Sequence, residues 1–109
     1  MILRIGTLLL VAACQPVAPD GPGAGRYTLV PAPGGLNVEG SGGREIGFGR
    51  DRPGVLQTVE RVERQAPRAA VCGPGRDAVL LRDGTRLIFE DGTFVGWDVP
   101  AGAAGRGCT

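Results

Sequence analysis

Two Asp-Gly pairs in the C-terminal part of the chain constrain its fold more than any other feature. Asp83-Gly84 and Asp91-Gly92 lie within Ala78–Val99, AVLLRDGTRLIFEDGTFVGWDV, and separate three runs of β-branched and aromatic residues. Asp-Gly favours a two-residue turn between antiparallel strands, because both central positions of that turn need a positive φ. The sequence therefore predicts a three-stranded antiparallel meander over this segment.

Two-residue turns at both sites would also fix which residues face one another across the strands. The expected pairs are Leu80 with Leu87, Phe89 with Phe94, and Arg86 with Trp97. The last pair would allow a guanidinium group to stack on the indole ring at the margin of the sheet. Both faces of this meander would be apolar, so each needs a cover. The helix can cover one face, and the N-terminal strands, a partner or neither of these can cover the other.

A helix is expected in the segment before the meander, DRPGVLQTVERVERQAP. Asp51 or Arg52 can cap its start, and Pro53 fits the first turn, where its missing N–H costs nothing. The apolar residues of this segment recur on one helical face; they are Val55, Leu56, Val59 and Val62.

Three short strands are expected upstream of this helix, at 26–30, 36–39 and 44–49, although Pro and Gly surround the first two. The predicted fold class is therefore α+β, with one short helix packed on a small antiparallel sheet that ends in the three-stranded meander.

The N-terminus has the pattern of an export signal. One positive charge, at Arg4, precedes the uncharged and mostly apolar stretch Ile5–Ala13. A nine-residue helix would span about 14 Å, whereas the hydrocarbon core of a bilayer is roughly 30 Å thick. A short apolar segment followed by small residues is typical of a secretory signal peptide. The alternative is a buried N-terminal helix or strand, which Gly6 and the Pro-containing segment after Gln15 disfavour.

The residues Val11-Ala12-Ala13-Cys14 resemble the lipobox of bacterial lipoproteins. This resemblance implies that the thiol of Cys14 takes a diacylglyceryl group as a thioether and that the chain is cleaved between Ala13 and Cys14. The new N-terminal amine of Cys14 is then acylated. Gln15, in place of Asp, resembles the pattern that sorts lipoproteins to the outer membrane. The implied organisation is a signal peptide at 1–13, a lipidated flexible tether at 14–25 and a domain facing the periplasm at 26–109.

Cys72 and Cys108 remain once Cys14 is assigned to the anchor. In an exported protein, two further cysteines favour a disulfide, and this one would enclose the whole meander. The chain-entropy relation gives it about 3.5–4 kcal/mol of stabilisation. Two free thiols are the alternative. A zinc site is disfavoured, because two cysteines without histidine leave the coordination incomplete.

The composition removes much of the usual catalytic chemistry. The chain has no His and no Lys, and its 12 basic residues are all Arg. It therefore lacks the commonest general base, the commonest nitrogen ligand for metals and an amine for Schiff bases. We assign no catalytic residue, metal or cofactor, and the short charge runs argue against nucleic acid as a partner. Ser41, in GSGGR, lacks the Lys and the spacing of a phosphate loop, so we interpret this segment as a turn.

The order of elements over 44–99 resembles small alphaproteobacterial envelope lipoproteins of no assigned activity. Its layout is also similar to lipoproteins accessory to outer-membrane barrel assembly and to β-lactamase-inhibitor-like domains. These resemblances imply a lipid-anchored envelope protein that binds a protein partner or supports the envelope, but they carry over no binding residues. The candidate contacts come from the meander itself, where an uncovered sheet face or strand edge would present Trp97 and Arg86. The alternative is a periplasmic inhibitor or small-ligand module. An enzyme would require Ser41, Tyr27 and a carboxylate to converge in a cleft.

Overall fold

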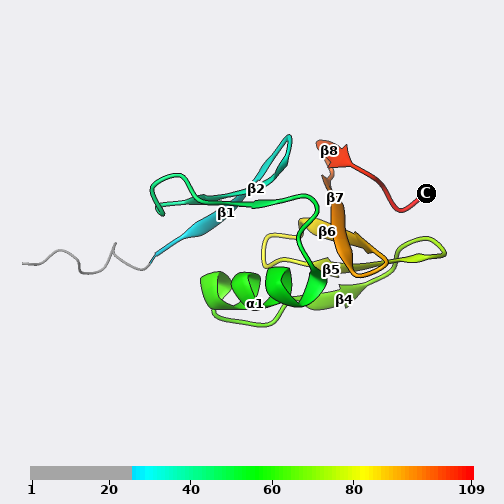
Figure 1. The fold of residues 1–109 in the computed structure, drawn as a ribbon, viewed down its shortest axis with the longest axis horizontal. Coiled ribbons are helices and arrows are strands. Elements are labelled where there is room, and N and C mark those ends of the chain that lie inside the picture. The colour runs from blue at the N-terminus through cyan, green and yellow to red at the C-terminus, as the bar shows by residue number, and fades with distance from the viewer. Residues whose placement is uncertain (1–25) are drawn as a thin grey trace, which may run out of the picture.

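The computed structural model describes residues 26–109, which form eight strands and one helix. In chain order these are β1 (Thr28–Ala32), β2 (Gly35–Glu39), β3 (Glu45–Gly47), α1 (Arg52–Glu63), β4 (Arg68–Ala70), β5 (Arg76–Leu80), β6 (Arg86–Glu90), β7 (Thr93–Val99) and β8 (Gly102–Gly105). The strands make two antiparallel sheets, β1-β2-β3 and β4-β5-β6-β7-β8. In Figure 1 the smaller sheet lies above α1, with β6 and β7 to the right of the helix.

The predicted fold class is wrong. This part of the chain is mainly β, and the helix accompanies two sheets of three and five strands instead of lying on a three-stranded meander. The meander extends by one strand on each side, through β4 and β8. These two strands, RAA and GAAG, consist of residues with low strand propensity, so no local pattern indicates them. They form because a strong central meander offers them edges with which to pair.

The second Asp-Gly turn is the expected two-residue turn, and the first is not. Asp91 and Gly92 have φ values of 52° and 77°, and Phe89 pairs with Phe94 as predicted. At the first site only Gly84 has a positive φ. The backbone N–H of Leu81 donates to the carbonyl of Thr85, so the loop between them is three residues long, and the Asp83 side chain accepts a hydrogen bond from the N–H of Thr85. The register between β5 and β6 therefore shifts by one, and Leu80 faces Arg86 instead of Leu87.

The helix has the predicted start. Asp51 is its N-cap and accepts a hydrogen bond from the backbone N–H of Gly54, and a proline lies in the first turn. It ends at Glu63, where Arg64 takes the left-handed conformation and donates its N–H to the carbonyl of Glu60. Val55 and Val59 are fully buried, which confirms the apolar stripe.

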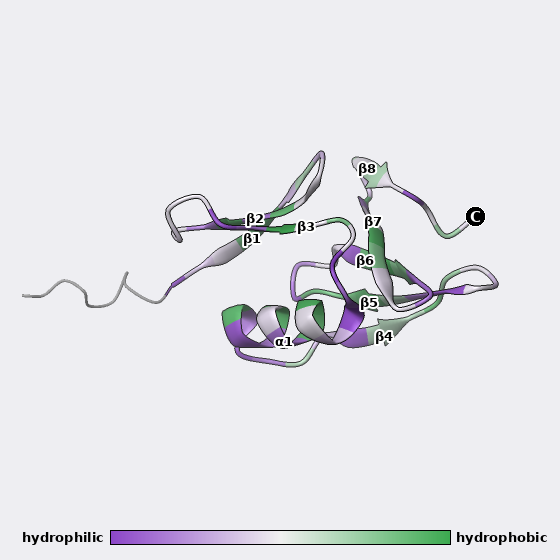
Figure 2. Cartoon of the chain, in the orientation of Figure 1, coloured by the Kyte–Doolittle hydropathy of each residue, from purple (hydrophilic) through white to green (hydrophobic). Residues whose placement is uncertain are grey.

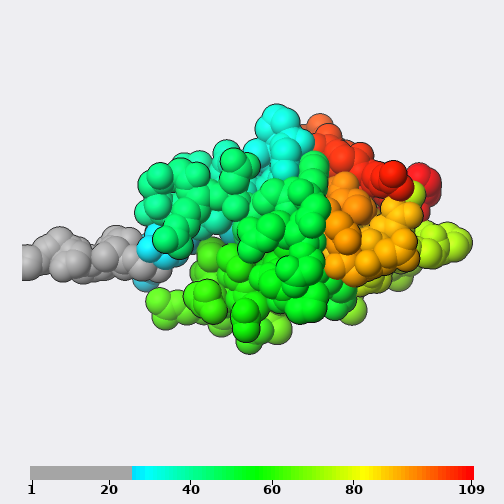
Figure 3. All heavy atoms as spheres, viewed as in Figure 1, coloured from blue at the N-terminus to red at the C-terminus, as the bar shows by residue number. Residues whose placement is uncertain are grey.

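One hydrophobic core joins the helix to both sheets. Figure 2 shows hydrophobic residues along β3 and β7, and Figure 3 shows the smaller sheet, in cyan to teal, packed against α1, in green. The ring of Phe94 lies 5.0 Å from that of Phe48 and 5.7 Å from that of Phe89, measured between centroids. The remaining buried members are Leu29, Leu36, Val38, Ile46, Val55, Val59, Val79, Leu81 and Leu87. The helix and the smaller sheet together cover this side of the larger sheet, which we call the core face.

The opposite side of the larger sheet, which we call the outer face, is covered in part by the last residues of the chain. The predicted disulfide is present and joins Cys72 to Cys108. The C-terminal segment 106–109 begins on β7, where the backbone N–H of Arg106 donates to the carbonyl of Val95. It ends beside β5, where Arg76 donates to the carbonyl of Gly107.

Ile88 pairs with Ala78 on β5 and with Gly96 on β7, so it lies between the two ends of the C-terminal segment. It is completely buried. A Cβ added to its neighbour Gly96 would lie only 2.0 Å from the carbonyl oxygen of Arg106. Because the main chain of the segment passes so close, only glycine fits here. The C-terminal segment is therefore the cover that the outer face required.

Candidate functional site

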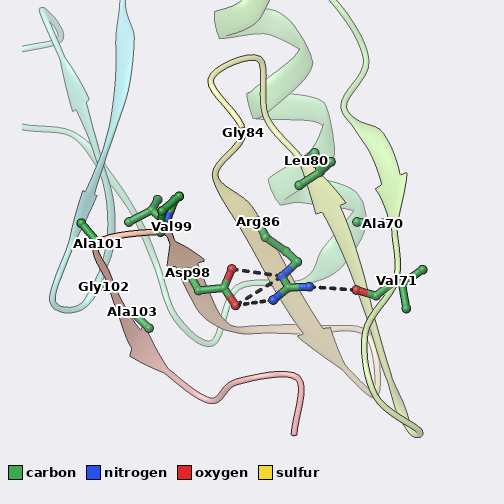
Figure 4. Close-up of a pocket in the computed structure, with 11 residues that line it drawn as sticks. Ala70, Val71, Leu80, Gly84, Arg86, Asp98, Val99, Ala101, Gly102 and Ala103 are labelled. Atoms are coloured by element: carbon green, nitrogen blue, oxygen red, sulfur yellow. Dashed lines mark hydrogen bonds and ion pairs between the residues drawn. The ribbon is translucent and has the colours of Figure 1, made fainter.

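A shallow, open depression occupies the part of the outer face that the C-terminal segment leaves free. Its floor is one register row across three strands, formed by Leu80, Arg86 and Asp98. One wall comes from Ala70 and Val71, at the end of β4. The other comes from the β7–β8 connection and the start of β8 (Figure 4). Its volume is about 820 Å³, and its walls consist mostly of small apolar side chains.

An ion pair lies at the centre of this floor. The guanidinium of Arg86 donates from Nε to Asp98 Oδ1 at 3.0 Å and from Nη2 to Asp98 Oδ2 at 2.9 Å. Its Nη1 donates to the carbonyl of Val71 at 3.2 Å, which ties the floor to the wall. The hydrogen bond with Asp98, and then the charge of that carboxylate, raise the pKa of Arg86 above its ordinary value. Because the two charges balance, the site presents a fixed and nearly neutral polar floor.

A β-bulge in β7 determines which residue faces Arg86. Phe94 pairs with Phe89, but the next pairs are Gly96 with Ile88 and Asp98 with Arg86, so Val95 is an extra residue. The predicted Arg86–Trp97 pair is therefore wrong, and these two candidate contacts lie on opposite faces of the sheet. Trp97 packs against the core, and its indole N–H donates to the carbonyl of Ala32 at 2.8 Å, between the two sheets.

The wall beside Arg86 belongs to an edge strand. β4 pairs with β5 on one side and has no strand on its other side within the described part of the chain. Ala69 is exposed although it lies opposite the buried Val79, so the core does not reach this edge. Val71 is 84% exposed. An open edge with an exposed apolar residue beside a depression can accept an extended chain segment.

A second groove brings together the residues that an enzyme would require. Tyr27, Ser41 and the carboxylates of Glu45 and Glu60 line the space between α1 and the smaller sheet. The hydroxyl of Ser41, however, donates to the carbonyl of Val38 and accepts from the backbone N–H of Arg44. Ser41 is thus engaged in holding the β2–β3 turn, as the sequence analysis predicted, and nothing in its hydrogen bonds activates it as a nucleophile.

The remaining candidates from the sequence are the cleavage and lipidation residues, a metal site, a membrane span and the two turn aspartates. Ala13 and Cys14, the predicted cleavage and lipidation residues, fall outside the described residues. Across residues 26–109, no three metal-binding side chains converge, and no helix is long and apolar enough to cross a bilayer. Asp83 and Asp91 hold turns, as expected.

Sequence reasoning missed Asp98 and Val71 as members of the site. Asp98 directly follows Trp97, and only the bulge brings it opposite Arg86. Val71 follows a strand that no pattern indicated. Comparisons with protein-family models, curated proteins and solved structures found no match to the chain.

Proposed function

We propose that this chain is a lipid-anchored envelope protein, held to the outer membrane on its periplasmic side, whose folded domain binds a protein partner. The lipobox-like residues ending at Cys14 support the anchor. A disulfide-closed domain supports an oxidising compartment. The observation that carries the binding role is the open edge of β4, with Val71 exposed beside the depression.

The partner would bind by adding an extended segment to β4. Backbone hydrogen bonds along the edge supply affinity in this mode, and pockets beside the edge select side chains. The depression beside β4 has small apolar walls and a balanced Arg86–Asp98 floor, so it suits a small apolar side chain from the partner. A charged side chain would find no unpaired counter-ion there.

The anchor is tested by the intact mass of the protein extracted from membranes. We expect the mass of residues 1–13 to be missing and the mass of acyl chains to be added at Cys14. A Cys14→Ser variant should keep the signal peptide and gain no lipid. An unprocessed chain with no lipid would refute the proposal that the protein is lipid-anchored.

The binding surface is tested in living cells with a photo-reactive residue at position 71, and with the same residue at exposed Gln57 on α1 as a control. One envelope protein cross-linked from position 71 alone is the expected result. Binding of that purified protein should then be weakened about tenfold or more by Val71→Asp, which places a charge in an apolar contact.

The matched control is Val30→Asp, at an exposed valine on β1, which belongs to the smaller sheet and not to the sheet that contains β4. It should leave binding unchanged. Equal weakening by both variants, or no cross-link specific to position 71, contradicts the proposed surface.

A further inference from the structure

The groove between α1 and the smaller sheet is positively charged. Its volume is about 820 Å³, within the range of small-molecule sites, and four arginines line it against the two glutamates already named. These arginines are Arg44, Arg50, Arg61 and Arg64. The four ion pairs found in residues 26–109 involve other arginines. The groove therefore gathers guanidinium groups that have no ion-pair partner in the described structure.

The arginines come from both sides of the groove. Arg61 lies in the last turn of α1, and Arg64 is its C-terminal cap. A helix C-terminus favours cations, so the helix alone accounts for these two. Arg44 directly precedes β3 on the opposite wall, and Arg50 directly precedes the N-cap Asp51, so neither gains from the C-terminus of the helix. Like charges brought together from two elements repel one another, so helix stability does not explain the whole group.

Other donors extend this cluster toward the start of the domain. Tyr27 lines the groove and is 42% exposed. A smaller hollow next to it is lined by Tyr27, Arg64, Arg26 and Arg82. Figure 3 shows the two elements that border this region, the smaller sheet in cyan to teal and α1 in green. Arg26 is the first described residue, so the charged end of the groove lies where the chain enters the domain.

We propose that this groove is a binding site for the phosphate group of a small ligand. Guanidinium groups present paired N–H donors that match the oxygens of a phosphate, and several around one groove neutralise its charge. The phosphate belongs either to a soluble phosphate ester or to the headgroup of an anionic phospholipid. This inference goes beyond the proposed protein-binding role, because it uses a different surface and does not depend on β4.

The test is a titration of the full-length protein in neutral detergent, followed by NMR of arginine side-chain and backbone N–H groups. One arm uses pyrophosphate, and the other uses micelles containing phosphatidylglycerol. Salt is held at about 0.15 M, where the Debye length of roughly 8 Å suppresses long-range attraction. We expect shifts confined to the groove in at least one arm. Shifts with pyrophosphate assign a soluble ester, and shifts with the lipid alone assign a headgroup.

Matched variants separate a site from general attraction. Arg44→Gln and Arg61→Gln each remove one donor from opposite walls and should weaken binding about tenfold, as expected for one charge-assisted hydrogen-bonding group. Arg68→Gln removes the same charge from exposed β4 and should have no effect. Trp97 fluorescence verifies that each variant is folded. Equal loss in all three variants, or no groove shifts with either probe, overturns the proposal.

Discussion

Removal of the Cys72–Cys108 disulfide is expected to destabilise the domain strongly. The cross-link closes a loop of 36 residues, which contains the whole of β5 to β8. The chain-entropy relation for a loop of this length gives about 3.8 kcal/mol of stabilisation at room temperature, mostly through the unfolded state. A double variant, Cys72→Ala with Cys108→Ala, removes the cross-link without leaving thiols. With a denaturant slope near 1 kcal/mol per M, its urea midpoint should fall by about 3–4 M.

This magnitude assumes that the C-terminal segment stays in place without the cross-link. Two contacts favour that outcome: Arg106 pairs with Glu90 at 2.9 Å, and Arg76 donates to the carbonyl of Gly107. If the segment detached instead, the folded state would gain chain entropy and the loss would be smaller than this value.

Urea unfolding is followed by the fluorescence of Trp97, the only tryptophan in the chain. Hydrogen exchange at the N–H of Arg106 reports whether the segment stays docked. Cys14→Ser, which removes a cysteine outside the loop, is the control and should leave the midpoint unchanged. A loss below about 1 kcal/mol with the Arg106 N–H still protected would refute the loop-closure argument.

Three further substitutions test the turn, the contact between the sheets and the ion pair. Gly92→Ala should lower the free energy of unfolding by about 1 kcal/mol, because φ is 77° there. The control Gly102→Ala, in open space without a positive φ, should leave it nearly unchanged in the same urea experiment. Equal effects of the two substitutions would contradict this. Trp97→Phe removes the donor to Ala32 and should cost about 1 kcal/mol by circular dichroism; unchanged stability would mean that water replaces this bond. Arg86→Met should cost about 1 kcal/mol, since both side chains of the pair are partly exposed, at 35% and 26%. The pKa of Arg86 is raised in the folded state, so its contribution to the free energy of unfolding is present below its unfolded pKa and is lost only as pH rises through its folded pKa. The stability difference between Arg86→Met and wild type should therefore be constant around neutral pH. A difference that disappears there would contradict the assignment.

Local chemistry predicted those parts of the fold that depend on a few adjacent residues. The N-cap at Asp51 and the turn at Asp91-Gly92 require particular side chains at particular positions, and both are present. The turn at Asp83-Gly84 shows the limit of this reasoning. An Asp-Gly pair is compatible with a two-residue loop and with a three-residue loop that ends in a left-handed glycine. Nothing in the pair itself selects between them.

Elements that depend on distant contacts could not be predicted in this way. β4 and β8 are short runs of Arg, Ala and Gly, and they become strands only because β5 and β7 offer open edges. The outer face could be predicted to need a cover, but the cover is a segment without secondary structure. The disulfide pairing was predictable from the number of cysteines and the expected compartment, which require no knowledge of the fold.

The bulge at Val95 connects the core to the candidate site. Phe94 and Trp97 are three residues apart, so strict alternation along β7 would place them on opposite faces. One extra residue places both on the core face, where Phe94 contacts Phe48 and Phe89 and Trp97 reaches the smaller sheet. The same shift turns Asp98 to the outer face opposite Arg86.

The bulged residue also helps to hold the C-terminal segment, because the carbonyl of Val95 accepts the N–H of Arg106. The bulge therefore has two effects: it buries Trp97 against the core, and it places Asp98 where it can pair with Arg86. A variant that deleted Val95 would have to exchange the faces of Trp97 and Asp98 together, which would bury a carboxylate and expose an indole. The depression exists because the core requires the bulge, and its polar floor follows from the same requirement.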